Sequence, residues 1–582
     1  MSGIAPIRRL QTDVLILGSG GAGLFAALHA HQADPALNIT IAVKGLLGKC
    51  GCTRMVQGGY NVALAPGDSV ERHFMDTIEG GKWLPDQDLA WTLVSTAVER
   101  VRELENELGC FFDRNPDGSV HQKAFAGQTF DRTVHKGDLT GIEIINRLAE
   151  QVWARDIGRL EEHRAIELIR TADGAAIAGV LFIDMRDGAF VFVQAKAVLL
   201  ATGGGPTMYK YHTPSGDKTC DGLAMALRAG LALRDMEMVQ FHPTGLLAGP
   251  GTRMTGTVLE EGLRGAGGYL LNAARERFMT DYDERGERAT RDIVSRGIFS
   301  EMRAGRTSPN GGVYLQMSHL GPDMVRKAFK GMVERCADCG FDLAGGSVEV
   351  VPTAHYMMGG VVFSADCSTA LEGLFAAGED TGGVHGANRL GGNGVANSTV
   401  FGGIAGETMA RWVAARGAWR APDEEALAAA RADAERVFMP ATASAGAAAA
   451  PGIEAAREAL QELMWNDVGI VRERTGLERA ARALVDIGAE LDEVRFGPID
   501  RAFNLSWHDW LNLRNLTAVS AAITAAALRR EDSRGAHFRS DHPGTGALED
   551  SAYTVVRQSG ADLAVTFAPV RFTRVQPGET LL

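Results

Sequence analysis

The sequence lacks the features typical of membrane, secreted, disulfide-stabilised and nucleic-acid-binding proteins. It has no uninterrupted apolar run of about 18 residues, and its start, MSGIAPIRRLQTD, has no apolar signal core, so we expect neither a membrane span nor secretion. Its 72 acidic residues outnumber its 59 basic ones, and no basic stretch offers a nucleic-acid surface. Seven cysteines among 582 residues are too few, and odd in number, for a disulfide framework. We therefore expect a folded cytoplasmic protein with mostly reduced thiols.

The cysteine spacing does not predict a metal site. Cys336 and Cys339 form one CxxC pair, while Cys50 and Cys52 are separated by one residue. No second close pair completes a four-ligand set, and no CxxCH haem attachment is present. We expect no metal in this chain, so any iron-sulfur cluster must belong to another protein.

A glycine-rich turn near the start of the chain predicts nucleotide binding. An apolar run ending at Leu17 leads into GSGGAG and then into a helical pattern. Gly18 allows the turn, Gly20 lets a pyrophosphate approach the backbone, and Gly23 lets the helix pack closely on the strand. An ordinary glycine-rich turn is the alternative, but the flanking strand and helix patterns favour a dinucleotide site.

The segments that follow argue against a simple NAD-binding site. The second predicted strand, 39–43, runs into Lys44 instead of the acidic residue that often holds a ribose hydroxyl. The glycine-rich segment 47–61 is suited to a loop over a flat cofactor, although a surface turn explains its composition equally well. The strand-like segment 195–205, AKAVLLATGGG, ends in glycines and can return to the nucleotide site.

Changes in composition divide the chain into five parts. Residues 1–245 carry the nucleotide-binding pattern and predicted helices at 89–108, 141–152 and 222–235. Residues 246–350 are rich in charge and glycine turns, as in an inserted capping domain, and residues 351–416 resume the first pattern with a helix from Thr399. Residues 417–540 are mostly helical around a flexible loop at 441–452, and residues 541–582 alternate like strands.

Nine motifs resemble the flavoprotein subunit of succinate dehydrogenase and fumarate reductase, a family that includes L-aspartate oxidase. In family order they are GSGGAG, TRMVQGG, ATGGG, DMEMVQFHPTG, RGAGGYLLN, RDIVSR, PTAHYMMGG, GANRLGGN and EDSRGAH. The resemblance covers essentially the whole chain. It implies an α/β fold: a Rossmann-like FAD-binding domain interrupted by an α+β capping domain, then a helical domain and a small C-terminal region.

The resemblance also assigns the chemistry. A dicarboxylate beside a flavin requires groups that grip carboxylates, a proton donor or acceptor, and exclusion of water. The family pattern assigns carboxylate binding to His242, His355 and Arg389 and the proton donor or acceptor to Arg291. An arginine loses its proton reluctantly, so the resemblance implies a relay through Glu261 and Arg264. His121, His135 and His385 receive no role.

The cofactor implied is FAD, held by two separated parts of one domain. The residues expected to contact it are Gly18, Gly20, Gly21, Ala22, Gly23, Lys44, Cys52, Thr53, Gln57, Gly58, Gly59, Ala201, Thr202, Gly203, Asp221, Glu379, Arg389, Gly392, Gly394 and Val395.

Three positions depart from the family pattern. Cys52 stands where many members carry the histidine that bonds FAD covalently, which favours non-covalent FAD over a cysteinyl bond. Glu260 replaces a threonine that holds a substrate carboxylate; it would repel a carboxylate but attract an ammonium or hydroxyl group, and Thr255 or Thr257 is an alternative donor. Phe125 occupies the place where L-aspartate oxidases carry a glutamate facing the amino group, which favours an unaminated dicarboxylate.

The leading hypothesis is an FAD-dependent oxidoreductase that acts on a C4 dicarboxylate or a close relative. One alternative is an L-aspartate-oxidase-like amino-acid oxidase, and another is a flavin-binding partner protein without catalysis. Electrons must pass to a separate protein, a quinone, a small acceptor or oxygen. The resemblance implies a separate iron-sulfur subunit, through which the cytoplasmic protein would attach peripherally to the inner membrane.

Overall fold

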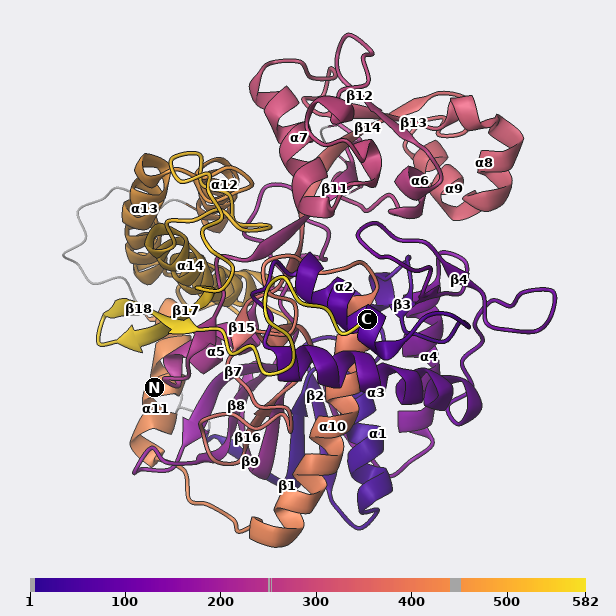
Figure 1. The fold of residues 1–582 in the computed structure, drawn as a ribbon. Coiled ribbons are helices and arrows are strands. Elements are labelled where there is room, and N and C mark those ends of the chain that lie inside the picture. Colours follow the sequence, from indigo (N-terminus) through magenta and orange to yellow (C-terminus); the bar gives the residue numbers. More distant parts are fainter. Residues whose placement is uncertain (1–5, 250–251, 253, 440–451) are drawn as a thin grey trace.

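A seven-stranded sheet forms the centre of the computed structural model, which describes residues 6–249, 252, 254–439 and 452–582 (Figure 1). The strand order is β6-β2-β1-β9-β8-β7, and β16 also pairs with β9. The strands are β1 (Arg8–Leu17), β2 (Ile39–Val43), β6 (Gly158–Glu161), β7 (His163–Arg170), β8 (Ile177–Asp184), β9 (Ala189–Leu200) and β16 (Leu374–Ala376). The first half of β9 pairs antiparallel with β8, and its last three residues pair parallel with β16. Two distant parts of the chain therefore build one sheet.

Two buried helices, α1 (Gly21–Ala33) and α10 (Asn393–Arg416), pack against each other over this sheet. Glycines permit the contact: a Cβ on Gly402 would lie 2.6 Å from the carbonyl oxygen of Ala22. Helix α10 begins at Asn393, one turn and a half before the predicted start at Thr399, because Gly392 adopts a left-handed φ of +89° and lets the chain turn into the helix. Helix α3 (Gln87–Asn106) contacts α10 as well.

A second lobe, at the top of Figure 1, corresponds to the capping domain. The long strands β11 (Val239–Leu246) and β14 (Ser347–Met357) pair antiparallel and connect it to the rest of the chain. Strands β13 (Val313–Gln316) and β12 (Tyr269–Leu271) complete its sheet. Its helices are α6 (Gly262–Gly265), α7 (Arg291–Arg303), α8 (Pro322–Ala328) and α9 (Lys330–Asp338). A separate apolar core lies within this lobe.

The predicted helix at 222–235 is wrong in its second half. Helix α5 (Asp221–Arg228) stops because Gly230 takes a φ of +83° and the amide of Leu231 donates to the carbonyl of Ala226, which closes the helix end. Leu233 and Arg234 then form strand β10. This strand pairs with β15 (Gly360–Val361) and with the C-terminal hairpin β17 (Ala552–Ser559) and β18 (Asp562–Pro569).

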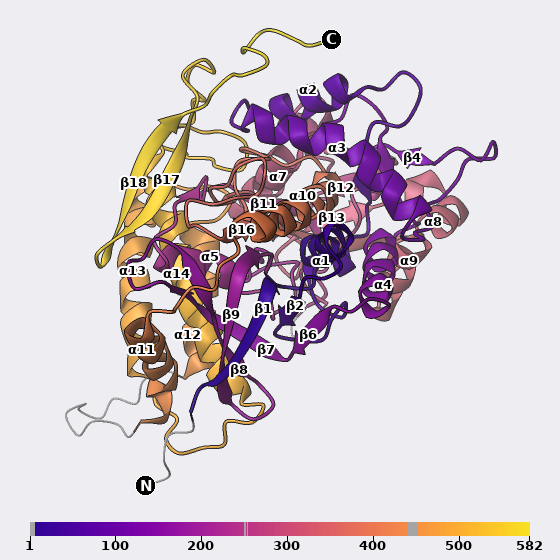
Figure 2. The ribbon, with the colours of Figure 1, turned by 90° about the horizontal axis from the view of Figure 1, so that it is seen from below.

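The helical domain comprises α11 (Glu424–Glu435), α12 (Ile453–Asp467), α13 (Arg474–Glu493) and α14 (Leu505–Arg529). Figure 2 shows the C-terminal hairpin beside α14, and the two are in contact. Residues 440–451, which hold most of the predicted flexible loop, lie outside the described residues. Among the described residues, no helix combines the length and hydropathy that crossing a bilayer requires.

The segment between β2 and β6 supplies the remaining elements. These are the small sheet β3 (Tyr60–Asn61), β5 (Thr133–Val134) and β4 (Gln122–Lys123), and the helices α2 (Val70–Gly80) and α4 (Thr140–Trp153). The small sheet matters for the site because β4 brings Lys123 towards the capping domain, as described below.

Candidate active site

One cavity of about 480 Å³ is lined by residues of both the sheet domain and the capping domain. All of the cofactor, substrate and catalytic residues predicted from the sequence line it, except Gly23 and Arg264. The residues come from segments up to several hundred positions apart, so the fold itself brings them together.

The glycines of the GSGGAG turn have two different roles: some allow close packing, and one leaves space at the cavity. A Cβ on Gly18 would lie 2.2 Å from the carbonyl oxygen of Ala201, and one on Gly23 would lie 2.0 Å from that of Gly18. These two glycines are therefore required for packing. The nearest atom to a Cβ on Gly20 is 3.8 Å away, so this position faces open space. Helix α1 starts at the next residue, without a cap from a side chain of its own N-cap residue. The amide of Gly21 donates to the Thr53 hydroxyl at 3.1 Å, and the other amides of the first turn are available to a phosphate.

A second helix terminus meets the same cavity. Helix α10 has no side-chain cap at Gly392, and Gly394 and Val395 in its first turn line the cavity. The side chain of Asn61 fixes this turn by donating to the carbonyl of Gly391 and to Asn393. Two positive helix ends at one cavity fit FAD, whose pyrophosphate and flavin ring can both accept hydrogen bonds.

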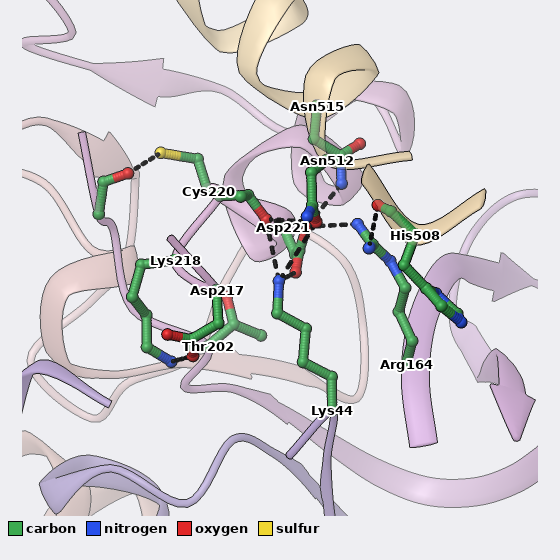
Figure 3. Close-up of polar contacts among 12 residues, drawn as sticks. Lys44, Arg164, Thr202, Asp217, Lys218, Cys220, Asp221, His508, Asn512 and Asn515 are labelled. Carbon is green, nitrogen blue, oxygen red and sulfur yellow. Dashed lines mark hydrogen bonds and ion pairs between the residues drawn. The ribbon is translucent and has the colours of Figure 1, made fainter. Parts of the chain in front are cut away.

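A network of buried polar groups surrounds Asp221 (Figure 3), and two of its members, Asp221 and Lys44, line the cavity. The carboxylate accepts from Lys44 at 2.7 Å, from Arg164 at 3.1 Å and from Asn515 of helix α14 at 2.7 Å. Burial would raise the pKa of Asp221, but Lys44 and Arg164 hold it far below the ordinary carboxyl range. Lys44, predicted as a cofactor contact, is thus also an anchor between the sheet and the helical domain.

The two cysteines of the early loop lie at the cavity as well. Cys52 sits in a 3-10 turn, and burial together with the Glu379 carboxylate raises the pKa of its thiol. Only a thiolate is a strong nucleophile, so this environment opposes a cysteinyl bond. Burial likewise raises the pKa of Glu379 to about 7.

The predicted relay residues form a continuous buried chain. The Arg291 guanidinium donates to one oxygen of Glu261 at 2.7 and 3.1 Å, and Arg264 donates to the other at 3.1 Å. A second partner of Arg291 is Gln240, at 3.0 Å, which the sequence did not indicate. Burial would raise the pKa of Glu261, but the two arginines outweigh it and keep the carboxylate ionised. Arg291 faces the cavity, and Arg264 lies behind Glu261.

The predicted carboxylate-binding residues lie on the adjacent wall. Pairing of β11 with β14 brings the rings of His242 and His355 to 5.5 Å between centroids. Burial and then the charge of Arg291 hold the pKa of both imidazoles well below the usual range, so both are neutral. Arg389 stacks over Tyr356 at 4.2 Å, and its buried Nε has no partner among the described residues. A neutral imidazole and an unpaired guanidinium N–H are both suited to donate to a carboxylate.

Two of the three positions that depart from the family pattern, Glu260 and Phe125, lie together. Glu260 is buried and paired with Lys123, a residue that the sequence did not single out, while Phe125 lies beside them. Burial raises the pKa of Glu260, and Lys123 opposes this effect. Thr257 lines the cavity, whereas the Thr255 hydroxyl bonds the backbone outside it.

Arg335 is another cation that the sequence analysis did not single out. It projects from α9 of the capping domain to the cavity and donates to the carbonyl of Val258 at 3.1 Å. Its isolated position in an ordinary amphipathic helix gave no signal, whereas Lys123 is two residues from Phe125 on the same extended segment.

The fold and the site together define a flavin-dependent oxidoreductase with an interrupted FAD-binding domain. Residues 13–395 match the FAD binding domain family, and residues 457–581 match the family described as fumarate reductase flavoprotein C-term. The chain belongs to the succinate dehydrogenase and fumarate reductase flavoprotein family, and its cofactor is FAD. The predicted family, fold class and enzyme class are thereby confirmed.

The relatives are similar over almost their whole length. One chain of the fumarate reductase (CoM/CoB) of Methanothermobacter marburgensis is 41% identical over 542 residues, 92% of this chain and 95% of that protein. An uncharacterized FAD-dependent oxidoreductase from Methanocaldococcus jannaschii is 40% identical over 538 residues, 92% of this chain and 94% of that protein. The flavoprotein chain of an Escherichia coli quinol fumarate reductase variant superposes with a TM-score of 0.91 at 31% identity, covering 98% of this chain and 99% of that one.

Proposed function

We propose that this protein catalyses hydride transfer between flavin N5 and a C4 dicarboxylate of the succinate or fumarate type, or a close relative. The observation that carries the proposal is the buried chain of Arg291, Glu261 and Arg264, which opens on the cavity at Arg291. A buried ion chain of this kind costs desolvation and is hard to explain as a stabilising device. Placed beside a flavin cavity, it is suited to proton transfer.

The other wall of the cavity supplies the grip on the substrate. Arg389 and the neutral imidazoles of His242 and His355 present donors towards the cavity, where two carboxylates would be bound and oriented. When bound, FAD supplies the acceptor or donor of the hydride. The capping domain excludes water and holds the proton donor against the substrate carbon.

The relay compensates for the weak acidity of arginine. A free guanidinium has a pKa above about 12 and does not give up a proton readily near neutrality. Arg291 shares two hydrogen bonds with the ionised Glu261. After Arg291 has given a proton to a carbanion-like substrate, Arg264 protonates Glu261, and Glu261 passes a proton on to Arg291, so that Glu261 ends ionised again. Arg264 then regains its proton from solvent. In the oxidative direction the same path carries the proton outward.

Glu260 supports a second candidate, an amino-acid oxidase of the L-aspartate oxidase type. A buried carboxylate at the cavity is a potential partner for a substrate ammonium group. Phe125, in place of the expected glutamate, favours the dicarboxylate reaction over this one.

The route of the electrons completes the proposal. Several relatives are named as flavoprotein subunits, so we propose that a separate iron-sulfur subunit exchanges electrons with the flavin and provides any peripheral attachment to a membrane. FAD is proposed to be non-covalent, because Cys52 stands at the histidine position with its thiol protonated.

The test is an anaerobic half-reaction on the purified holoprotein. We expect the reduced flavin to be reoxidised by fumarate, and succinate to reduce an artificial acceptor. Glu261→Gln should lower turnover by about 100-fold or more, while dicarboxylates still perturb the oxidised flavin spectrum. Glu462→Gln, in an exposed pair with Lys210, is the matched control and should retain full turnover. Turnover of aspartate with oxygen, without turnover of succinate, would favour the oxidase; Glu261→Gln at wild-type rate would refute the relay.

A further inference from the structure

Glu260 offers an unused acceptor at the substrate end of the cavity. One of its oxygens accepts from Lys123, and no described residue donates to the other. The neighbouring Glu261 differs, because both of its oxygens are held by arginines. Glu260 is only 4% exposed and lines the cavity, so its free oxygen is placed where a ligand can donate to it.

Lys123 sets the charge of this corner. Its ammonium pairs with Glu260 across the junction of the β4 segment and the capping domain, and it lies over the Phe125 ring at 5.8 Å. Lys123 itself does not line the cavity, and its side chain is 21% exposed to solvent. The pair is therefore neutral overall, and the group that it presents inward is an acceptor. Nearby, the cavity lining adds one further acid, Asp138, whose charge adds to the effect of burial in raising the pKa of Glu260, and one further cation, Arg335, so acidic and basic side chains remain equal in number here.

Four other residues of the lining have the reverse character. Arg291 and Arg389 bring positive charge, and His242 and His355 are neutral donors. A substrate carboxylate belongs beside these residues. Against Glu260, a carboxylate would set two acceptors face to face in a buried site, which is unfavourable in charge and in hydrogen bonding.

We propose that Glu260, neutralised by Lys123, is a specificity-determining residue that accepts a hydrogen bond from a hydroxyl group on the substrate, so that the preferred ligand is a 2-hydroxy dicarboxylate rather than an unsubstituted one. A hydroxyl suits this corner better than an ammonium, because the Glu260 charge is already matched by Lys123 and a second cation would be surplus. This inference rests on the proposed dicarboxylate function and narrows its substrate class.

The test measures binding to the oxidised holoprotein, without turnover, from the change in the flavin absorption spectrum. The ligands are 2-hydroxysuccinate, succinate, fumarate and aspartate. We expect wild type to bind 2-hydroxysuccinate at least tenfold more tightly than succinate. Glu260→Thr, which restores the usual residue of the family, should bring that ratio to one or below. Lys123→Met should shift the preference from 2-hydroxysuccinate towards aspartate, because the carboxylate loses its cation. Lys210→Met removes an exposed lysine pair elsewhere and should change no ratio.

Each contrary outcome has a distinct meaning. Equal binding of succinate and 2-hydroxysuccinate by wild type would show that the substrate hydroxyl gains nothing from Glu260, and would overturn this inference while leaving the proposed function intact. A ratio unchanged by Glu260→Thr would overturn it as well. If none of the dicarboxylates perturbs the spectrum of wild type or of Glu260→Thr, the proposed function falls together with the inference.

Discussion

Asp221→Asn tests how the buried network around Asp221 supports FAD binding. Oδ1 of Asp221 accepts from Arg164, Thr219 and Asn515, whereas Oδ2 pairs with Lys44. Asparagine can keep the oxygen on the first side, but it must then turn an N–H towards the Lys44 ammonium. The variant therefore keeps the shape of the network and leaves two buried cations without their counter-ion.

The size of the effect follows from the burial of the pair. Removing one partner of a buried ion pair costs about 3–5 kcal/mol, and the lower end applies because the Lys44 side chain is 18% exposed. Both residues line the cavity, so bound FAD keeps water away from Lys44 and the empty cavity admits it. A cost of about 3 kcal/mol in the bound state weakens FAD binding about 100-fold.

The assay is FAD titration of the apoprotein, followed by the quenching of flavin fluorescence. Asp217→Asn is the matched control, because Asp217 also lines the cavity but its side chain, which pairs with Lys218, is 38% exposed. This variant should change the affinity for FAD less than about fivefold. Lys44→Met combined with Asp221→Asn should recover only part of the loss, because it removes the unpaired ammonium but leaves Arg164 without its counter-ion. Wild-type affinity and melting temperature in Asp221→Asn would refute the reasoning.

The pH dependence of this variant follows from the direction of the pKa shift. Burial acts to raise the pKa of Asp221, and Lys44 with Arg164 lowers it far more, so the folded pKa lies below the unfolded one. The contribution of the carboxylate is then present at all pH values above about 4 and lost only in stronger acid. Burial lowers the pKa of Lys44, and loss of the Asp221 charge lowers it further, so the difference in FAD affinity between wild type and variant should narrow as the pH rises and Lys44 of the variant loses its proton.

Two further predictions concern the cofactor cradle. Gly20→Ala should fold with nearly wild-type thermal stability but bind FAD more weakly, because its methyl group would enter the cavity. Gly23→Ala should lower the melting temperature, because its Cβ would lie 2.0 Å from the Gly18 oxygen. Thermal unfolding and FAD titration distinguish the two variants, and equal behaviour would contradict the assigned roles. Acid precipitation of wild type should leave the flavin in the supernatant, and Cys52→Ser should retain FAD as well as wild type does; a yellow pellet from wild type but not from Cys52→Ser would establish a cysteinyl bond instead.

Short-range patterns in the sequence predicted the parts of the site that depend on local geometry. The glycine turn before α1 combines a strand, positive-φ glycine and helix, and each of these has a local signal. The relay and the carboxylate grip came from the family resemblance, because nothing local in Arg291 or His242 indicates that they share one cavity. Lys123 was missed for the same reason: its partner is 137 positions away on another domain. The overlong prediction around 222–235 failed at Gly230, where backbone conformation ended a helix that composition alone would continue.

The predicted site residues come from both lobes, so in the proposed mechanism the capping domain takes part in catalysis as well as covering the site. The predicted cradle for FAD belongs to α1, α10 and the main sheet, but Arg291 begins α7, and Glu261 with Arg264 flanks or lies within α6. The proposed proton path is therefore attached to one lobe, and the proposed hydride partner to the other. Gln240 on β11 bonds Arg291 and the carbonyl of Arg389, so it fixes the distance between the relay and the carboxylate grip. Any movement of the capping domain about β11 and β14 would separate proton transfer from hydride transfer, and the cross-domain pair of Lys123 with Glu260 is placed to oppose it.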